Sequence, residues 1–268
     1  TGNDRIQVFD SAGNFLYKFG SNNAQGSYYT DPGNSSGSDD CYQGGSGVAG
    51  EVNRKFCHPV GIDVDSSGKI YVPDRGDPNS GDLSEIQVFD SSGNFLSKFG
   101  SSDTDNSKDC QDNELNDPFA VGKNPATNNI FVVDSNNNCI QVYNSSGNFL
   151  FNFGSSGSGD GQFRFPEDID FDSAGNVFVV DTGNDRIQVF DSSGNFLTKL
   201  THDTLFNYPR GLAIAESLNK IYVTNYNNNN ILTFSINLPL NDITPQTTTT
   251  STNSTSTNST STNSTSTN

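Results

Sequence analysis

Hydrophobic and polar positions alternate along a phrase that recurs through the chain. In one copy, residues 187–190 (Ile-Gln-Val-Phe) begin by alternating, residues 191–195 (Asp-Ser-Ser-Gly-Asn) have turn chemistry, and residues 196–200 run back. Each copy therefore predicts two antiparallel strands joined by a tight turn. Four near copies begin at Asp4, Glu85, Cys139 and Asp185, and a worn fifth copy begins at Ile231. Recurrence of this kind marks a repeat architecture.

A second strand pair precedes the phrase in each repeat. Residues 168–172 and 177–180 read as strands around a Ser-Ala-Gly-Asn turn. Four short strands joined by tight turns form one propeller blade of about 40 to 45 residues. These inner pairs start at Ile62 and Ile70, Val121 and Ile130, Ile169 and Val177, and Leu212 and Ile221. Because no stretch has a sustained helical period, the sequence predicts an all-β propeller of four blades.

The strand count leaves one strand over. The N-terminal half-blade, Ile6 to Gly20, can complete the C-terminal half-blade, Leu212 to Val223, and close the ring with a composite blade made from both termini. Residues 231–236 then compete with residues 6–9 for one position. The surplus strand is either a cap or linker, or an exposed edge that pairs with another chain. A six-bladed ring lacks the strands unless a second chain contributes them.

The chain divides into a propeller and a tail. Residues 1–240 form the predicted propeller, and insertions at 21–55, 73–84 and 101–117 break the repeat. Residues 241–268 form an extended low-complexity tail that cannot bury a core and reads as a solvated stalk. Acceptor sites for N-linked glycans (Asn-X-Ser/Thr) occur at Asn34, Asn144, Asn253, Asn258 and Asn263.

Two stretches resemble known propeller repeats. Phe165-Pro166-Glu167-Asp168-Ile169-Asp170, followed by Gly175 through Phe190, closely resembles an NHL repeat. Residues 220–225 (Lys-Ile-Tyr-Val-Thr-Asn) resemble the YVTN repeat of archaeal cell-surface propellers. The resemblance covers roughly residues 1–236 and implies the propeller fold. It says little about function, because propellers of this family serve as RNA binders, protein binders, lyases and surface modules.

The composition of the chain argues against two of the functional classes, nucleic-acid binding and membrane insertion. The chain has 14 Lys+Arg against 31 Asp+Glu, a formal net charge of -17, which opposes the clustered cations that nucleic-acid binding needs. No apolar stretch approaches the roughly 20 residues of a membrane span, and no signal peptide is recognisable. The chain contains no Met and opens inside a blade, which we interpret as a processed, mature chain.

Cysteines and glycan acceptor sites point outside the cell. Cys41, Cys57, Cys110 and Cys139 have no metal-type spacing. Pairing of Cys41 with Cys57, and of Cys110 with Cys139, would pin two insertions to the blades that follow them. Spacing alone leaves the connectivity open, and four reduced thiols are the alternative. Since disulfides persist mainly in oxidising compartments, we expect a secreted or cell-surface glycoprotein, and the YVTN resemblance points to an archaeal surface.

Candidate catalytic chemistry is sparse. His58 and His202 are the only histidines, too few for the multi-His zinc site of the NHL-like amidating lyases. Family propellers that hydrolyse esters or lactones hold calcium in the central channel, which His58, Glu167, Asp168 and Arg210 would line here. These residues form no matched ligand set, and no Cys-His, Ser-His-Asp or Gly-rich phosphate motif has usable spacing. We therefore expect a non-enzymatic protein that requires no cofactor.

One insertion carries a calcium candidate. Oxygen-bearing side chains stand at positions 1, 3, 5, 7, 9 and 12 of a calcium loop, namely Asp103, Asp105, Ser107, Asp109, Gln111 and Glu114. Lys108 occupies position 6, where the turn calls for Gly, so a solvated acidic loop is the alternative. The tripeptide Arg75-Gly76-Asp77 matches an adhesion motif, but without further context it reads as a chance loop.

The sequence as a whole predicts an extracellular structural protein that assembles with copies of itself, as a filament or surface lattice, through tail or edge-strand contacts. A head-to-tail contact that does not close grows into a fibre, and strand addition would supply its hydrogen bonds. The expected partners are copies of the chain and N-linked glycans, with no nucleic acid and no membrane span. The alternatives are a monomeric surface module that binds glycan or protein on the propeller face, and a calcium-dependent hydrolase.

Overall fold

The computed structural model describes residues 5–20, 56, 58–76, 84–102, 110–201 and 204–235. These residues form β-strands, connecting loops and two single turns of 3-10 helix, η3 (Thr182–Asn184) and η4 (Glu216–Leu218). Neither turn has the length and apolarity that a membrane crossing requires. The prediction of an all-β chain is confirmed.

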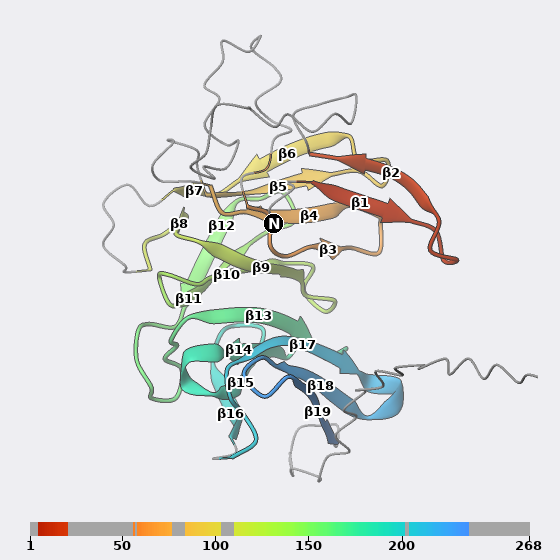
Figure 1. Ribbon diagram of the computed structural model, residues 1–268. Coiled ribbons are helices and arrows are strands. Elements are labelled where there is room, and N and C mark those ends of the chain that lie inside the picture. Colours follow the sequence, from red (N-terminus) through yellow and green to blue (C-terminus); the bar gives the residue numbers. More distant parts are fainter. Residues whose placement is uncertain are drawn as a thin grey trace, which may run out of the picture.

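Four antiparallel sheets follow one another along the chain as propeller blades (Figure 1). The first blade comprises β3 (Asp63–Val64), β4 (Ile70–Asp74), β5 (Glu85–Phe89) and β6 (Phe95–Phe99). The second comprises β9 (Pro118–Lys123), β10 (Ile130–Asp134), β11 (Cys139–Tyr143) and β12 (Phe149–Phe153). The third comprises β13 (Pro166–Phe171), β14 (Val177–Asp181), β15 (Arg186–Phe190) and β16 (Phe196–Thr201). The fourth comprises β17 (Pro209–Ala215), β18 (Lys220–Asn225) and β19 (Asn230–Ser235).

Two smaller sheets complete the described residues. An N-terminal hairpin consists of β1 (Ile6–Phe9) and β2 (Phe15–Phe19), and a short parallel pair consists of β7 (Ser101–Ser102) and β8 (Glu114–Leu115). β7 and β8 lie within the predicted insertion 101–117, and β4 runs two residues into the predicted insertion 73–84. The insertion 21–55 and the tail 241–268 lie outside the described residues.

The recurring phrase forms the third and fourth strands of each complete blade. Its turn is stable because the first side chain of the turn accepts hydrogen bonds from backbone N–H groups of the same turn. In the first blade, Asp90 Oδ1 accepts hydrogen bonds from Ser92 N at 2.9 Å and Asn94 N at 2.8 Å. Gly93 takes a positive φ of 78° in this turn, a conformation that glycine adopts without steric penalty. The equivalent side chains of the other copies, Asp10, Asn144 and Asp191, accept the same pair of hydrogen bonds.

One aromatic contact repeats where the hairpin packs on the first blade, the first blade on the second, and the second on the third. The last aromatic ring of a fourth strand contacts the last aromatic ring of the following third strand. The centroids are 4.7 Å apart for Phe99 and Tyr143, 5.0 Å for Phe153 and Phe190, and 4.8 Å for Phe19 and Phe89. The same ring covers the turn glycine of the following sheet, where a Cβ atom would lie 2.7 to 2.8 Å away at Gly93, Gly147 and Gly194. The repeat therefore encodes its own stacking.

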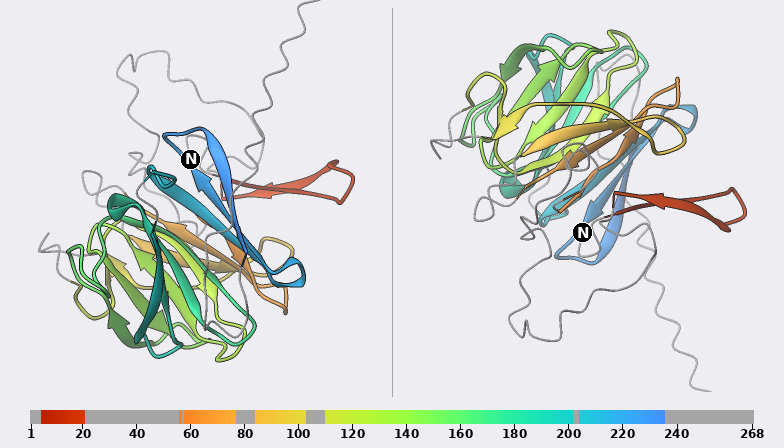
Figure 2. Two further views of the ribbon diagram at one scale, coloured as in Figure 1. Left: turned by 90° about the horizontal axis from the view of Figure 1, so that it is seen from below. Right: turned by 90° about the horizontal axis from the view of Figure 1, so that it is seen from above.

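The predicted composite blade is wrong. β1 pairs with β2 alone, and the fourth blade takes β19 as its own third strand, with register from Lys220–Ser235 to Asn225–Asn230. Through Phe19 the hairpin packs on the first blade, as the outer half of a blade that would precede it (Figure 2). The phrase is nearly identical in every copy, so the sequence could not tell which sheet the hairpin joins; the long-range contact of Phe19 with Phe89 decides it.

Candidate binding face

Each blade delivers one backbone-strained residue to the same end of its strands. Ahead of each innermost strand a residue with positive φ precedes a proline, namely His58 (63°), Asp117 (61°), Phe165 (47°) and Tyr208 (59°). Such conformations are uncommon outside glycine and cost about 1–3 kcal/mol each. We use the name loop face for this end of the blades, which carries the connections from fourth to first strands; the opposite end carries the Asp-Ser-Ser-Gly-Asn turns.

Two arginine–carboxylate pairs lie on the loop face. Arg75 Nη2 donates to Asp117 Oδ2 at 2.7 Å, and Arg210 Nε lies 3.2 Å from Glu167 Oε2. Burial raises the pKa of Glu167, and the charges of Arg210 and Arg75 oppose that rise. Both arginines therefore form ion pairs with carboxylates of the neighbouring blade.

Aromatic rings cover the same arginines. The Arg75 guanidinium lies 4.9 Å from the centroid of Phe119. The Arg210 guanidinium lies 4.2 Å from the centroid of Tyr226 and 5.4 Å from that of Tyr208. Such stacking holds a planar guanidinium in one orientation.

The residues expected to line the central channel have separate roles. Glu167 and Arg210 meet in an ion pair. Asp168 points to the fourth blade, where its Oδ2 accepts a hydrogen bond from Leu212 N at 2.7 Å. His58 starts the first blade in a left-handed conformation. Within the described ranges, no three His, Cys, Asp or Glu side chains gather closely enough to hold a metal ion.

Carboxylates connect the innermost strands of neighbouring blades. Backbone N–H groups of one strand donate to side chains of the strand before it: Lys123 to Asp63 at 2.8 Å, Leu212 to Asp168 at 2.7 Å, and Ile214 to Asp170 at 2.7 Å. Burial raises the pKa of Asp168 to about 7 and also raises that of Asp170. These aspartates satisfy strand edges that would otherwise lack partners. The sequence analysis missed this role, although acidic residues at alternate strand positions are a visible signal.

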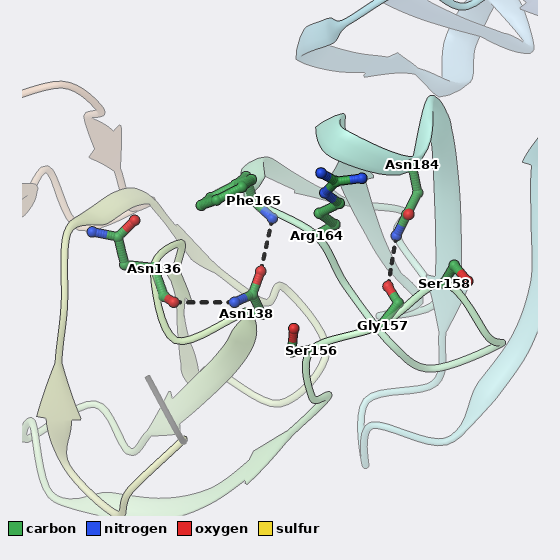
Figure 3. A pocket seen from close by; sticks show the side chains of 8 residues that line it. All are labelled: Asn136, Asn138, Ser156, Gly157, Ser158, Arg164, Phe165 and Asn184. Carbon is green, nitrogen blue, oxygen red and sulfur yellow. Dashed lines mark hydrogen bonds between the residues drawn. The ribbon is translucent and has the colours of Figure 1, made fainter. Parts of the chain in front are cut away.

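A polar pocket opens on the loop face between the second and third blades (Figure 3). Its volume is about 440 Å³, within the range of small-molecule sites. The lining comes from the β10–β11 connection, the β12–β13 loop and η3, and consists of Asn136, Asn138, Ser156, Gly157, Ser158, Arg164, Phe165 and Asn184.

Hydrogen bonds fix the amides that line the pocket. Asn138 Nδ2 donates to the carbonyl of Asn136 at 3.0 Å, and Asn138 Oδ1 accepts from Phe165 N at 2.8 Å (Figure 3). Asn184 Nδ2 donates to the carbonyl of Gly157 at 2.8 Å. The pocket wall is therefore formed by side chains whose orientation is set by backbone contacts.

A buried arginine holds the β12–β13 loop in place. Arg186 donates to the carbonyls of Ser158 at 2.9 Å, Gly159 at 2.8 Å and Gln162 at 2.7 Å. Its Nε also donates to buried Asp181 Oδ2 at 2.7 Å, which compensates both charges. One wall of the pocket thus rests on the core of the third blade.

A disulfide holds the equivalent loop of the second blade in place. Cys139 occupies the repeat position of Arg186, and the structure joins it to Cys110 in the preceding loop, across a sequence separation of 29 residues. The predicted pairing of Cys110 with Cys139 is confirmed. Cys41 and Cys57, the other predicted pair, lie outside the described residues.

The remaining predicted sites are mostly outside the described ranges. This applies to Asn34, Asn253, Asn258 and Asn263 and to the calcium candidates Asp103, Asp105, Ser107 and Asp109. Asn144 lies in the partly exposed turn between β11 and β12, where its side chain accepts two backbone hydrogen bonds. Glu114 lies in β8, where its carbonyl accepts a hydrogen bond from Gln141 Nε2. Glycosylation and calcium binding stay predictions.

Comparison with known proteins identifies the fold family. The 6-bladed beta-propeller family matches residues 124–264, and no curated protein matches the chain. A structure of streptogramin B lyase is 18% identical with a TM-score of 0.50, over 68% of this chain and 55% of that one. A protein from Lactobacillus plantarum is 15% identical with a TM-score of 0.52, over 70% and 54% of the two chains. A functionally unknown protein from Desulfotomaculum acetoxidans is 14% identical with a TM-score of 0.51, over 70% and 55%.

These similarities concern the fold alone, because the identities are low. The chain spans about half the length of the solved structures it matches. The described residues hold four of the blades that the family description counts as six, together with the hairpin. Because the family match covers more than half of the sequence, the chain belongs to the 6-bladed beta-propeller family.

Proposed function

We propose that this protein is a non-enzymatic structural protein of the cell exterior that assembles head to tail with copies of itself. The observation that carries the proposal is the bare outer face of the N-terminal hairpin. Phe9 occupies the repeat position of three rings, Phe89, Tyr143 and Phe190. Phe9 is 50% exposed, whereas the other three are at most 1% exposed. The sheet that should cover β1 is missing from the described part of the chain.

The turn of the hairpin also lacks the aromatic ring that covers the equivalent turns, among the described residues. Gly13 occupies the repeat position of Gly93 and has a similar φ of 83°. A Cβ at Gly93 would lie 2.7 Å from the ring of Phe19, whereas no described atom lies within 4 Å of a Cβ at Gly13. The hairpin therefore leaves space on Gly13 for one aromatic ring of a preceding blade to pack.

The fourth blade is open on the side away from the third blade. In β18, Ile221 and Val223 are buried while Tyr222 and Thr224 are partly or fully exposed. The second strands of the first three blades are instead buried at every residue. Ile231 in β19 is 56% exposed. Within the described residues, the arc of blades thus ends in an uncovered sheet face on the hairpin and on the fourth blade.

A second copy is the occupant that fits both faces. If the fourth blade of one copy packs on the hairpin of the next, each sheet buries the exposed side chains of the other, among them Phe9 of the hairpin and Ile231 of the fourth blade. The two surfaces differ, so the contact is heterologous, and it grows into a filament when the rotation between copies does not close a ring. Residues 247–268 consist of Thr, Ser and Asn only, and so bring no large apolar side chain to either face.

The exterior location rests on different features. The Cys110–Cys139 disulfide is typical of an oxidising compartment. The glycan acceptor sites of the tail, and the resemblance of residues 220–225 to the YVTN repeat of archaeal cell-surface propellers, agree with a surface structural role.

Electron microscopy and light scattering of the intact chain test this function. We expect linear assemblies whose size grows with protein concentration. Phe9→Glu should abolish them and leave the melting temperature nearly unchanged, because a solvent-exposed residue contributes little to the monomer. Leu197→Glu is the control, since Leu197 is 47% exposed on a blade whose neighbours are present. Monodisperse single particles from the intact chain would contradict self-assembly, and assemblies of Phe9→Glu would contradict the hairpin contact.

A further inference from the structure

We infer that the pocket between the second and third blades binds a carboxylate-bearing sugar residue, such as a hexuronic acid of an extracellular polysaccharide. The inference is independent of self-assembly, because it uses neither terminal face of the arc. It rests on the charge, the exposed ring and the fixed amides of the pocket wall (Figure 3).

The charge of the pocket is opposite to that of the chain. The chain has a net charge of -17, yet none of the lining residues is acidic and one is an arginine. Arg75, Arg186 and Arg210 each pair with a carboxylate. Within the described ranges Arg164 is exposed and forms no ion pair. Its guanidinium is thus available to a ligand carboxylate, which it can grip with two parallel hydrogen bonds.

The backbone of Arg164 is held while its side chain is exposed. Arg164 N donates to Asp181 Oδ1 at 2.8 Å, and Gly183 N donates to the carbonyl of Arg164 at 2.8 Å. The backbone at Arg164 is therefore already ordered before a ligand binds, so binding does not have to order it.

An aromatic ring stands beside the arginine. Phe165 is 44% exposed although it carries a large apolar surface. Its amide is held by Asn138, and its φ of 47° turns the residue out of the strand that begins at Pro166. One face of a pyranose ring presents C–H groups, and covering the phenyl ring with that face removes apolar surface from water.

The other polar residues of the pocket wall can form hydrogen bonds with the hydroxyl groups of a sugar. Asn184 uses its Nδ2 on Gly157 and Asp181, so that its Oδ1 remains to accept a hydrogen bond from a ligand hydroxyl. Ser156 and Ser158 add hydroxyls that both donate and accept. An acidic peptide would use the arginine but would leave most of these groups without partners, whereas a sugar acid uses all of them.

Isothermal titration calorimetry with trigalacturonate tests the inference, with its methyl ester and a Glu-rich peptide as comparison ligands. We expect trigalacturonate to bind, and the neutral methyl ester to bind about tenfold more weakly, the loss expected for one charge-assisted contact. In Arg164→Gln the two sugars should bind equally weakly. Phe165→Ala should weaken both by about tenfold.

Two matched variants serve as controls. Arg5→Gln removes the same charge at a distance from the pocket, and Tyr208→Ala alters the same backbone position in the next blade. Both should leave the affinity for trigalacturonate within about twofold, and all variants should unfold cooperatively, as the wild type does. No heat from trigalacturonate at millimolar concentration, or equal affinity in wild type and Arg164→Gln, would overturn the inference. Tighter binding of the Glu-rich peptide would assign the pocket to acidic peptides and would also overturn it.

Discussion

At the scale of single residues, the carboxyl group of Asp168 gives the fold a distinctive pH dependence. Burial raises its pKa from the usual 3.8 to about 7, so between these values the folded chain holds a proton that the unfolded chain has released. The stabilisation from this proton is complete below the unfolded pKa and is lost as pH rises through the folded pKa. We predict that Asp168→Asn stabilises the chain by about 2–4 kcal/mol at pH 8.

Thermal unfolding between pH 4 and 8 measures this effect. The amide of Asn keeps an oxygen for the Leu212 N–H, so the variant should retain the contact between the blades. Its pH slope should be smaller than that of the wild type, with Glu167 and Asp170 still contributing. Asp191→Asn is the control, because Asn144 already makes the same turn in the second blade. Equal slopes in wild type and Asp168→Asn would show that this carboxyl does not titrate with folding.

At the scale of elements, the second and third blades each hold the loop that precedes them, but by different means. Arg186→Gln leaves buried Asp181 without its ion pair, and we expect a loss of about 3–5 kcal/mol. Reduction of Cys110–Cys139 opens a loop of 29 residues and should remove about 3–4 kcal/mol. Denaturant titration under oxidising and reducing conditions measures both. Lys199→Gln, which breaks only an exposed pair with Asp160, should cost less than about 1 kcal/mol.

The elements themselves could be predicted because the repeat is local. Alternating residues and an Asx-type turn define a hairpin within 16 or so residues, and the strands beginning at Ile70, Ile130 and Val177 start where the sequence analysis placed them. The partner of the N-terminal hairpin could not be predicted in the same way. Every copy of the phrase presents the same edge and faces, so only packing between distant residues, such as Phe19 on Phe89, distinguishes one partner sheet from another.

The pocket escaped prediction for a related reason. Its residues come from three connections that lie far apart in sequence, and no short motif joins Asn138, Arg164 and Asn184. The disulfide was one of the connectivities that the spacing left open, and it joins an insertion at Cys110 to the blade that follows at Cys139. The aspartates between blades carry a pattern, but alternating acids in a strand ordinarily read as a solvated face.

At the scale of the whole molecule, the described residues form an arc of blades, and no other described residue covers the end sheets of that arc. Within the described ranges β1 pairs on one edge, so in the unassembled chain its outward amides should exchange rapidly with solvent. The strands of the second and third blades lie between covered faces and should exchange slowly. We predict that assembly protects β1 and the outer face of the fourth blade and changes little in the middle of the arc.

Hydrogen–deuterium exchange on assembled wild type and on Phe9→Glu makes this comparison. Uniform protection in both samples would mean that neither end of the arc takes part in a contact. Protection of β1 alone would place a different surface of the neighbour against the hairpin.

The strained residue that precedes each inner-strand proline has an evolutionary consequence. His58, Asp117, Phe165 and Tyr208 differ in charge, size and polarity, yet each has the same left-handed backbone. Asp and His tolerate this conformation better than bulky side chains do, yet Phe165 and Tyr208 adopt it as well. Each blade thus carries one position whose side chain differs while the backbone of the repeat stays the same. Relatives with the same scaffold could acquire new surface ligands by changing these positions one blade at a time.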